Sequence, residues 1–403
     1  MSIFLVVLFS YKIIAAIVGV LNGIMYLCNS ICLVDPFFMS RESFKRCKLL
    51  APLSLIFRLA VGLRNKFFDW KILPSEEFDV PVISVGNLTV GGTGKTPHTE
   101  YLIKLLKDRY KVALLSRGYK RKSKGFLLAT SGCSAKSIGD EPYQIKLKFP
   151  DIHVAVDSNR RNGIHKLCES EISKNVEAIL LDDAFQHRYV IPGVSIVLMD
   201  YNRPVYEDSL LPVGMLRESI SSLDRAHVVI VTKCPEDIKP IDFRVVTKRL
   251  NLRPYQRLYF TTFSYGKMRA FQPPHECRAL STLSTDTHIL LVTGIASADP
   301  LVERLREYTE HITHLEYSDH HDFTRAELLS ISRIYAAIEA EDKLIITTEK
   351  DAARLRCCML DEVVVDNLYV LPVEVKFLQN QQANFDHYII DYVSKNSRNR
   401  IVH

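Results

Sequence analysis

The chain has 403 residues, a length that predicts two or three domains with sizeable cores. Its net charge of +6 favours anionic partners without specifying one, and the dispersed basic residues with no recognised nucleic-acid motif disfavour nucleic acid. The nine cysteines lack the spacing of metal ligands, so we expect reduced thiols in a cytosolic setting.

The N-terminal segment, residues 1–48, is strongly apolar. Its run from Ile13 to Val34 carries no charged residue and exceeds the ~20 residues that a helix needs to cross a bilayer. The basic residues between Arg41 and Lys48 would hold the following chain in the cytoplasm. Two alternatives stay open: the segment is a signal peptide, or it precedes a true start at Met39.

Residues 49–72 predict a helix that lies in the membrane interface. Most of its circumference is apolar, and basic and aromatic side chains gather near its C-terminal end at Trp70. The polar residues recur at helical spacing along one narrow strip: Ser54, Arg58, Gly62, Asn65 and Asp69. The alternative is a core helix packed under the first domain.

The stretch from Val80 to Leu106 predicts a phosphate-binding loop. A buried strand at Val82–Val85 is followed by a glycine-rich turn, and Lys95 and Thr96 then open an amphipathic helix. In such a loop the backbone N–H groups and the helix N-terminus face the phosphates, the lysine reaches the β/γ-phosphates, and the threonine ligates Mg²⁺. Thr89 replaces the first glycine of the usual pattern. The turn residues expected to contact the nucleotide are Gly91, Gly92, Thr93 and Gly94.

Short apolar runs then alternate with helical stretches, which predicts a mostly parallel sheet covered on both faces. The expected strands are Lys111–Ser116, Ile152–Val156, Val176–Leu181, Val194–Met199 and His227–Thr232. Ligands bind beyond the carboxyl ends of such strands. Asp182 and Asp183 end one strand, and this Walker B arrangement holds Mg²⁺ directly or through water, although a helix cap would look similar.

Alternating residues between Pro and Gly boundaries predict a β-rich connector at residues 253–266. We therefore expect a P-loop domain at residues 73–252 and a smaller α/β domain, without a phosphate loop of its own, at residues 267–403. Its expected elements are strand His288–Ala296, a helix from about Asp299, helix Arg325–Glu341, strand Lys343–Thr348 and a last strand, Tyr369–Val375.

Phosphoryl transfer to an alcohol needs positioning, cations and a base for the hydroxyl proton. Asp140, in the sequence GDEP, is one candidate base, and the alternative is that it only caps the helix Tyr143–Lys148. The other candidate is the DHHD segment from Asp319 to Asp322, where a histidine beside a carboxylate can orient and tune it. No third cluster supports a metal site there. Residues that could clamp phosphates are Arg117, Arg160 and Arg161.

Taken together, the motifs resemble the tetraacyldisaccharide 4′-kinase family of lipid A biosynthesis, from about Leu49 to Val375. In order they are VISVGNLTVGGTGKTP, LLSRGY, GDEP, DDAFQH, LLPVGMLRE, VTGIA, SDHHDF and TTEKDA. The resemblance implies an ATP- and Mg²⁺-dependent kinase at the cytoplasmic face of the inner membrane. It would phosphorylate the 4′-hydroxyl of the lipid A disaccharide 1-phosphate to give lipid IVA. In this family Thr89 is normal, whereas Ala184 stands where DDGFQ is usual and questions the local backbone.

The resemblance also implies roles for particular residues. Lys95 and Thr96 would hold the β/γ-phosphates and Mg²⁺, Asp182 would serve Mg²⁺, and Asp183 would serve the nucleotide phosphates. Asp140 would be the catalytic base. Its implied partner and the other implied active-site residues are His320 of the DHH motif, Arg160 and Glu218, with Gln186 and His187 nearby.

Two other functions compete with a membrane lipid kinase. A membrane-tethered P-loop NTPase could act as a switch or assembly factor, although Val231–Cys234 resembles the guanine-reading NKxD motif only loosely. A soluble small-molecule kinase is disfavoured by the apolar, basic segment from Leu49 to Trp70. The family normally begins near Leu49, and everything before about Met39 is extra, which fits either a misassigned start or a second membrane anchor. The sequence leaves the oligomeric state open.

Overall fold

The computed structural model describes residues 50–171, 173, 175–272, 277–295, 297–319 and 321–399. The chain divides into two compact units, one of Met1–Lys95 with Asp183–Phe260 and the other of Thr96–Asp182 with Thr261–His403. The predicted extension, including Ile13–Val34 and Met39, lies outside the described residues. The domain boundaries expected from the sequence stay predictions.

The first unit contains α3 (Ala51–Asp69), β1 (Val82–Asn87), β6 (Val194–Asp200), η2 (Val205–Glu207), η3 (Ile220–Arg225), β7 (Val228–Thr232) and α8 (Pro240–Leu250). Two elements, α4 (Lys95–Leu106) and β8 (Arg257–Tyr265), begin in this unit and end in the other. Every residue of β1 and β6 is buried, as expected for central strands of a sheet that is covered on both faces.

The second unit begins with β2 (Val112–Ser116), β3 (Leu127–Leu128), α5 (Ala135–Ile138), α6 (Asp140–Lys148), β4 (His153–Val156), α7 (Arg160–Glu169) and β5 (Ala178–Asp182). It continues with β9 (Arg269–Ala270), η4 (Leu280–Thr282), β10 (His288–Thr293), α9 (Asp299–Arg306), β11 (Ile312–Glu316), α10 (Arg325–Ala337), β12 (Lys343–Thr348), α11 (Glu349–Leu355), α12 (Glu362–Asn367), β13 (Leu368–Leu371), β14 (Val373–Phe377) and α13 (Gln382–Asn399).

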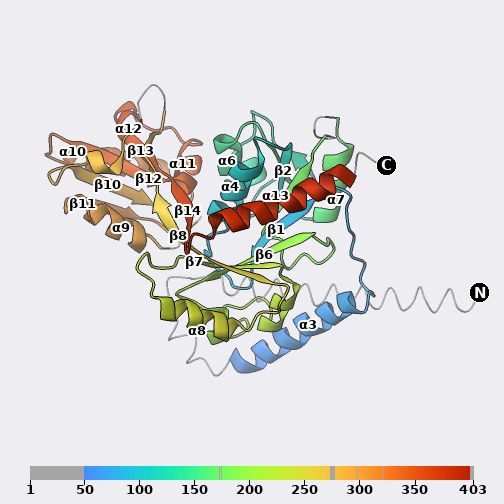
Figure 1. The fold of residues 1–403 in the computed structure, drawn as a ribbon. Helices are drawn as coiled ribbons and strands as arrows, with labels where there is room; N and C mark the ends of the chain where they lie inside the picture. Colours follow the sequence, from blue (N-terminus) through green and yellow to red (C-terminus); the bar gives the residue numbers. More distant parts are fainter. Residues whose placement is uncertain are drawn as a thin grey trace, which may run out of the picture. The chain divides into compact units, whose positions relative to one another are not determined.

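Two sheets organise these elements, which confirms the α/β class expected from the sequence (Figure 1). The larger has nine strands in the order β14-β8-β7-β6-β1-β5-β2-β4-β3, and the smaller has five in the order β11-β10-β12-β13-β9. Parallel pairing links β1 to β6, β6 to β7, β7 to β8, and β2 to both β4 and β5. The edge pairs β14–β8 and β3–β4 are antiparallel, so the large sheet is mixed.

The helix α3 has two different faces. Phe57 and Val61 pack against Leu211 on one face, and Phe68 meets Tyr189 edge-on, with 5.0 Å between the ring centroids. The opposite face leaves large apolar side chains such as Leu59 exposed. The predicted helix is therefore confirmed, while its place in a membrane stays a prediction. Among the described residues, no helix combines the length and hydropathy of a membrane span.

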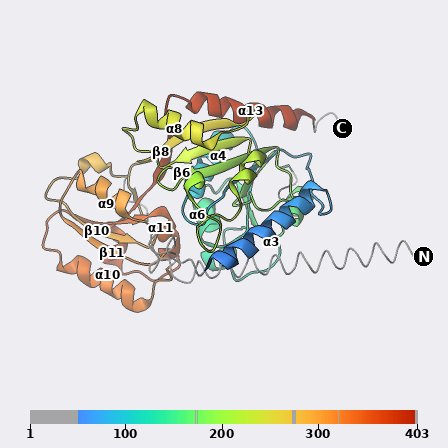
Figure 2. The same ribbon diagram turned by 90° about the horizontal axis from the view of Figure 1, so that it is seen from below.

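The smaller sheet is covered on both faces, because successive side chains of a strand alternate between them. Leu290 and Val292 of β10 pack with Ile331 of α10, whereas Ile289 and Leu291 pack in the cluster that includes Leu301 of α9. Figures 1 and 2 accordingly show α9 and α10 on opposite sides of this sheet.

The last predicted strand, Tyr369–Val375, is divided in the structure. β13 stays in the smaller sheet, parallel to β12, whereas β14 pairs antiparallel with β8 in the larger one. Pro372 separates the two strands, and a proline cannot donate the hydrogen bond that a continuous strand would need there. The chain then enters α13, which lies against α4, where Tyr101 donates to Asp386 at 2.6 Å (Figure 2).

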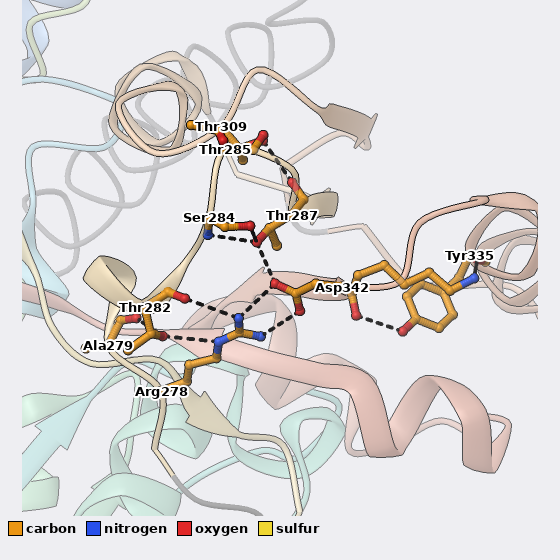
Figure 3. A network of polar contacts seen from close by, with 10 residues as sticks. Arg278, Ala279, Thr282, Ser284, Thr285, Thr287, Thr309, Tyr335 and Asp342 are labelled. Atoms are coloured by element: carbon orange, nitrogen blue, oxygen red, sulfur yellow. Dashed lines mark hydrogen bonds and ion pairs between the residues drawn. The ribbon is translucent and has the colours of Figure 1, made fainter.

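A polar network closes the amino ends of the strands in the smaller sheet (Figure 3). Arg278 donates to both carboxylate oxygens of Asp342 at 3.2 and 3.0 Å, and Thr287 donates to Asp342 at 2.5 Å. Thr309 donates to the carbonyl of Thr287 at 2.8 Å. The network residues Asp342, Thr287 and Thr309 each precede a strand, so the network stabilises the amino ends of the strands. Ligands bind at the opposite, carboxyl ends of such strands.

Candidate active site

The glycine loop after β1 has a backbone that requires glycine at two positions. Gly91 and Gly94 have φ values of +107° and +85°, a region that other residues rarely adopt. Around Gly92, no atom of the described residues, apart from Gly92 itself and its two chain neighbours, lies within 4 Å of the position that a Cβ would take. The loop therefore keeps an open approach for a ligand at its middle.

Thr89, the departure from the usual motif, lies in extended backbone. It forms an antiparallel bridge with Leu216, and the neighbouring Val90 N–H donates to the carbonyl of Met215 at 2.8 Å. On the other side, the Arg217 N–H donates to the carbonyl of Leu88 at 2.7 Å. The motif LLPVGMLRE thus pairs with the start of the loop, and an extended residue at position 89 has no need of glycine.

Thr93 anchors the loop to the ends of two strands. Its side chain is fully buried and accepts a hydrogen bond from Asn87 of β1 at 2.8 Å. Its carbonyl accepts from the hydroxyl of Thr232, the last residue of β7, at 3.0 Å. Its backbone N–H donates to the carbonyl of Gly91 at 3.0 Å, so Thr93 is a structural support of the loop.

A charged cluster forms beside the loop from Lys95, Asp183 and Arg217. The Lys95 Nζ lies 3.7 Å from the Asp183 carboxylate, and Arg217 Nη1 contacts both oxygens of that carboxylate at 3.1 and 3.2 Å. Asp183 has a φ of +46°, a left-handed conformation that Asp tolerates better than most residues. Ala184 has no positive φ, which answers the question raised by its replacement of glycine.

Sequence reasoning missed three cations near this loop. Arg217 adjoins the predicted Glu218, and Arg203 lies so close to Gly91 that a Cβ there would be 3.4 Å from its guanidinium. The third is Lys233, which donates to Asp200 at 2.9 Å. Asp200 ends β6, and Lys233 directly follows β7. An examination of every residue at a carboxyl strand end would have found this pair.

Glu218 is fully buried and is paired with Arg225 at 2.5 Å. Asn65 of α3 also approaches it, at 3.5 Å, and no described group bonds its Oε1 atom. The Arg225 guanidinium lies 4.5 Å from the ring centroid of Phe185, in the DDAFQH motif, and burial lowers its pKa. Glu218 thus joins α3 to this motif. Its role at the nucleotide stays a prediction.

The other residues of DDAFQH also brace the site. Gln186 donates to the carbonyl of Asn87 at 2.7 Å, and its own carbonyl accepts from Arg64 of α3 at 3.0 Å. His187 stacks at a tilt beside Tyr189, with 5.5 Å between the ring centroids. Gln186 therefore ties the strand that leads into the glycine loop to the helix before it.

In the second unit the structure brings Arg160 and Asp182 together. Arg160 is 3% exposed and donates to the carbonyls of Asp157 at 3.2 Å and Asp182 at 3.3 Å. Asp182, also 3% exposed, accepts from the hydroxyl of Ser116 at 3.1 Å. Arg160 thus holds the backbone at the end of β5, and Asp182 presents a carboxylate at the same strand end.

Asp140 is the first residue of α6, and Gly139 occupies the N-cap position before it. Gly139 has a φ of +95°, and a Cβ there would lie 3.1 Å from the Cα of Gly118. Because Gly118 and Gly139 have no side chains, the backbones of the motifs LLSRGY and GDEP pack directly against each other. The Asp140 carboxylate accepts a hydrogen bond from the Nε of Arg354 at 2.9 Å.

The SDHHDF motif is described only in part, because His320 lies outside the described residues. Asp319 pairs with Lys350 at 2.7 Å, and His321 contacts Glu327 at 2.9 Å while stacking on Tyr317. Within the part of the chain that the structure covers, no group of three His, Cys, Asp or Glu side chains is arranged to hold a metal ion. The pairing of Asp140 with His320 stays a prediction.

The strand, the glycine loop, the lysine at the helix start and the acids at a strand end define a P-loop phosphotransferase fold. Such a site can bind a nucleoside triphosphate and stabilise the charge that develops during transfer of its terminal phosphate. A sequence profile described as LpxK: Tetraacyldisaccharide-1-P 4′-kinase matches residues 46–393. The chain belongs to this family, and it is an enzyme of the kinase class.

Individual relatives agree with this assignment. The tetraacyldisaccharide 4′-kinase of Phocaeicola vulgatus is 56% identical over 362 residues, covering 90% of this chain and 99% of the relative. That of Porphyromonas gingivalis is 44% identical, covering 84% and 95%. The crystal structure of LpxK from Aquifex aeolicus in complex with ATP has a TM-score of 0.65 at 26% identity, covering 87% of this chain and 99% of that one.

Proposed function

We propose that the protein transfers the γ-phosphate of ATP to the 4′-hydroxyl of the lipid A disaccharide 1-phosphate, giving lipid IVA. The family and its close relatives support the reaction and the acceptor, and the relative solved with ATP supports the donor. The observation that carries the proposal is the cluster of Lys95, Asp183 and Arg217 at the glycine loop. It concentrates cations where a triphosphate would lie.

Two oxygen-bearing residues, Thr96 in the first turn of α4 and Asp182 at the end of β5, fit Mg²⁺. The hydroxyl of Thr96 and the carboxylate of Asp182 are hard oxygen ligands of the kind that Mg²⁺ takes together with nucleotide phosphates. Asp182 is buried at a strand end, so its carboxylate is held in one place by Ser116. When bound, Mg²⁺ would neutralise charge on the β- and γ-phosphate oxygens.

The transfer needs one base and several cations. As the acceptor oxygen bonds to the γ-phosphorus, its proton passes to the carboxylate of Asp140, with His320 as the partner of that base. The bond between the γ-phosphorus and the bridging oxygen breaks, and ADP leaves with the electron pair. Lys95 and Arg217 stabilise the charge on the transferring group. The Asp140 side chain is 24% exposed, so a substrate can reach it.

The acceptor is a lipid, and α3 offers a surface for the membrane that contains it. The side chains of Leu55, Leu59 and Trp70 are 57%, 64% and 61% exposed, and Lys66 lies over the ring of Trp70. Apolar side chains beside a basic and aromatic helix end suit an interfacial position. We infer that α3 holds the enzyme at the cytoplasmic face of the inner membrane.

A transfer assay tests this function directly. The full-length protein and a form that begins at Met39 are each supplied with ATP, Mg²⁺ and detergent-dispersed lipid acceptor. Both should phosphorylate the acceptor. Asp140→Ala should nearly abolish turnover while ATP binding survives, whereas Lys95→Ala should impair the nucleotide step. ATP hydrolysis by folded protein without phosphate transfer would contradict the proposal and favour an NTPase switch.

A further inference from the structure

Two motifs of the smaller sheet, VTGIA and TTEKDA, carry none of the catalytic roles proposed above, although Lys350 of TTEKDA pairs with Asp319. Both lie at the carboxyl ends of neighbouring strands, because Gly294 follows β10 and Asp351 lies in α11, directly after β12. Asp351 is fully buried, and its carboxylate accepts from the N–H of Gly294 at 2.9 Å and the hydroxyl of Thr348 at 2.7 Å. The two motifs therefore form one buried polar cluster.

This buried polar cluster holds the guanidinium of Arg354. Its Nη1 donates to the carbonyl of Gly294 at 3.0 Å and to Asp351 at 2.9 Å. A Cβ on residue 294 would lie 3.1 Å from the Asp351 carboxylate, so a side chain there would press on the pair. The arginine side chain is 5% exposed, which means that these contacts fix its direction.

The Nε of this fixed guanidinium donates to Asp140 at 2.9 Å, across 214 residues of sequence. Helix α11, which contains Arg354, also contacts the C-terminal end of α6. Its Glu349 lies 2.6 Å from Lys148, the last residue of α6. The helix that presents Asp140 is thus held at its first and last residues by one element.

We propose that Arg354 is the positioning residue of the catalytic base, fixed by the VTGIA and TTEKDA motifs so that the Asp140 carboxylate faces the acceptor hydroxyl. The proposal rests on the function proposed above. A charge-assisted hydrogen bond to one oxygen restricts rotation of the carboxylate, and small misplacement of a reacting group is costly in rate. The positive charge also favours the ionised form that can accept a proton.

The test compares Arg354→Met and Arg354→Lys with Arg356→Lys. Arg356, two residues further on, donates to the carbonyl of Phe271 and serves as the matched control. Arg354→Met should lower kcat by roughly 10- to 100-fold with the KM for ATP unchanged. The acid limb of its kcat profile should move up by about one pH unit, because loss of a neighbouring cation raises a carboxyl pKa. Arg354→Lys should fall between these values, and Arg356→Lys should match the wild type.

A double variant separates positioning from general stability. In an Asp140→Asn background, Arg354→Met should cost less than a further threefold in kcat, because the group that it positions is already lost. Thermal unfolding and ATP affinity show whether each variant is folded, and the lysine variant keeps a cation beside Asp351. An unmoved acid limb in both Arg354 variants, or losses that multiply in the double variant, would overturn the inference. An inactive wild type would overturn the proposed function as well, so the two failures are distinguishable.

Discussion

A buried lysine at the C-terminal end of α6 supports a quantitative prediction. Lys148 lies 2.5 Å from Glu100 of α4 and 2.6 Å from Glu349 of α11, and these three side chains are 8%, 4% and 12% exposed. Gln144 donates to the other oxygen of Glu100 at 2.9 Å, and Arg269 also pairs with Glu349 at 2.5 Å. Replacement of Lys148 by Met would leave Glu100 buried without a cation.

The cost follows from the burial. Removing one partner of a buried ion pair costs about 3–5 kcal/mol of unfolding free energy. Burial, and then the charge of Glu349, raise the pKa of Glu100 from 4.5 to about 7, against the opposing effect of Lys148. Because the pKa of Glu100 is raised in the folded state, the wild type loses stability as the pH rises from 4.5 through about 7.

Lys148→Met should therefore be pH-dependent. Loss of the lysine raises the pKa of Glu100 further, so we expect a loss of about 3–5 kcal/mol at pH 8. At pH 5 Glu100 is protonated and Arg269 still pairs with Glu349, which leaves a loss of about 1 kcal/mol. Urea unfolding at both pH values measures the difference. Adding Glu100→Gln should recover much of the loss at pH 8.

An exposed ion pair of α4, the helix that contains Glu100, provides the control. Lys104 contacts Glu374 at a comparable 2.7 Å, but the two side chains are 45% and 49% exposed. Lys104→Met should cost below about 1 kcal/mol, because exposed pairs are screened by solvent. Equal losses for Lys148→Met and Lys104→Met, or a loss from Lys148→Met that is the same at pH 5 and pH 8, would refute the reasoning.

Three further predictions concern other parts of the chain. Gly139→Ala places a side chain at a φ of +95° and within 3.1 Å of backbone atoms. The free energy of unfolding, followed by thermal unfolding, should fall by about 1–3 kcal/mol, and kcat should also fall. An unchanged melting temperature would contradict this prediction. Glu327→Gln should cost about 1 kcal/mol at pH 7 in urea unfolding, because Glu327 closes the capping box of α10. The Thr324 backbone N–H, and then His321, lower the pKa of Glu327 to about 2. The stability that Glu327 contributes is therefore present above pH 4.5 and is lost as the pH falls through about 2. Below about pH 2 the variant should be as stable as the wild type. Leu55→Ser with Leu59→Ser should reduce sedimentation with anionic vesicles by several-fold without changing stability, since both side chains are exposed, and equal binding would argue against α3 as the membrane contact.

The glycine loop could be predicted from sequence because its geometry is local. Strand, turn and helix lie within one short stretch. The positive φ values at residues 91 and 94 require glycine, and these glycines are visible in the sequence. The strands of the large sheet were also predictable, since strands buried on both faces read as continuous apolar runs. The same locality placed Asp182 and Asp183 at the end of β5.

The partners of these residues were not predictable in this way. Arg217 and Asp183 are 34 residues apart, and Arg354 and Asp140 are 214 apart. A single sequence carries no signal that pairs one arginine, among many, with one carboxylate at such distances. The split of the last strand was hidden for a similar reason, because apolar alternation does not say which sheet edge a strand will join.

The sequence by itself determined that this chain has a phosphate loop, parallel α/β layers and the motifs of one kinase family. These features depend on backbone preferences and on the periodic burial of neighbouring residues. Only the tertiary structure decided that Thr89 needs no glycine because it pairs with Leu216, and that Arg354 contacts Asp140. Such contacts join segments that are far apart in the sequence, so their cause is tertiary packing rather than local pattern.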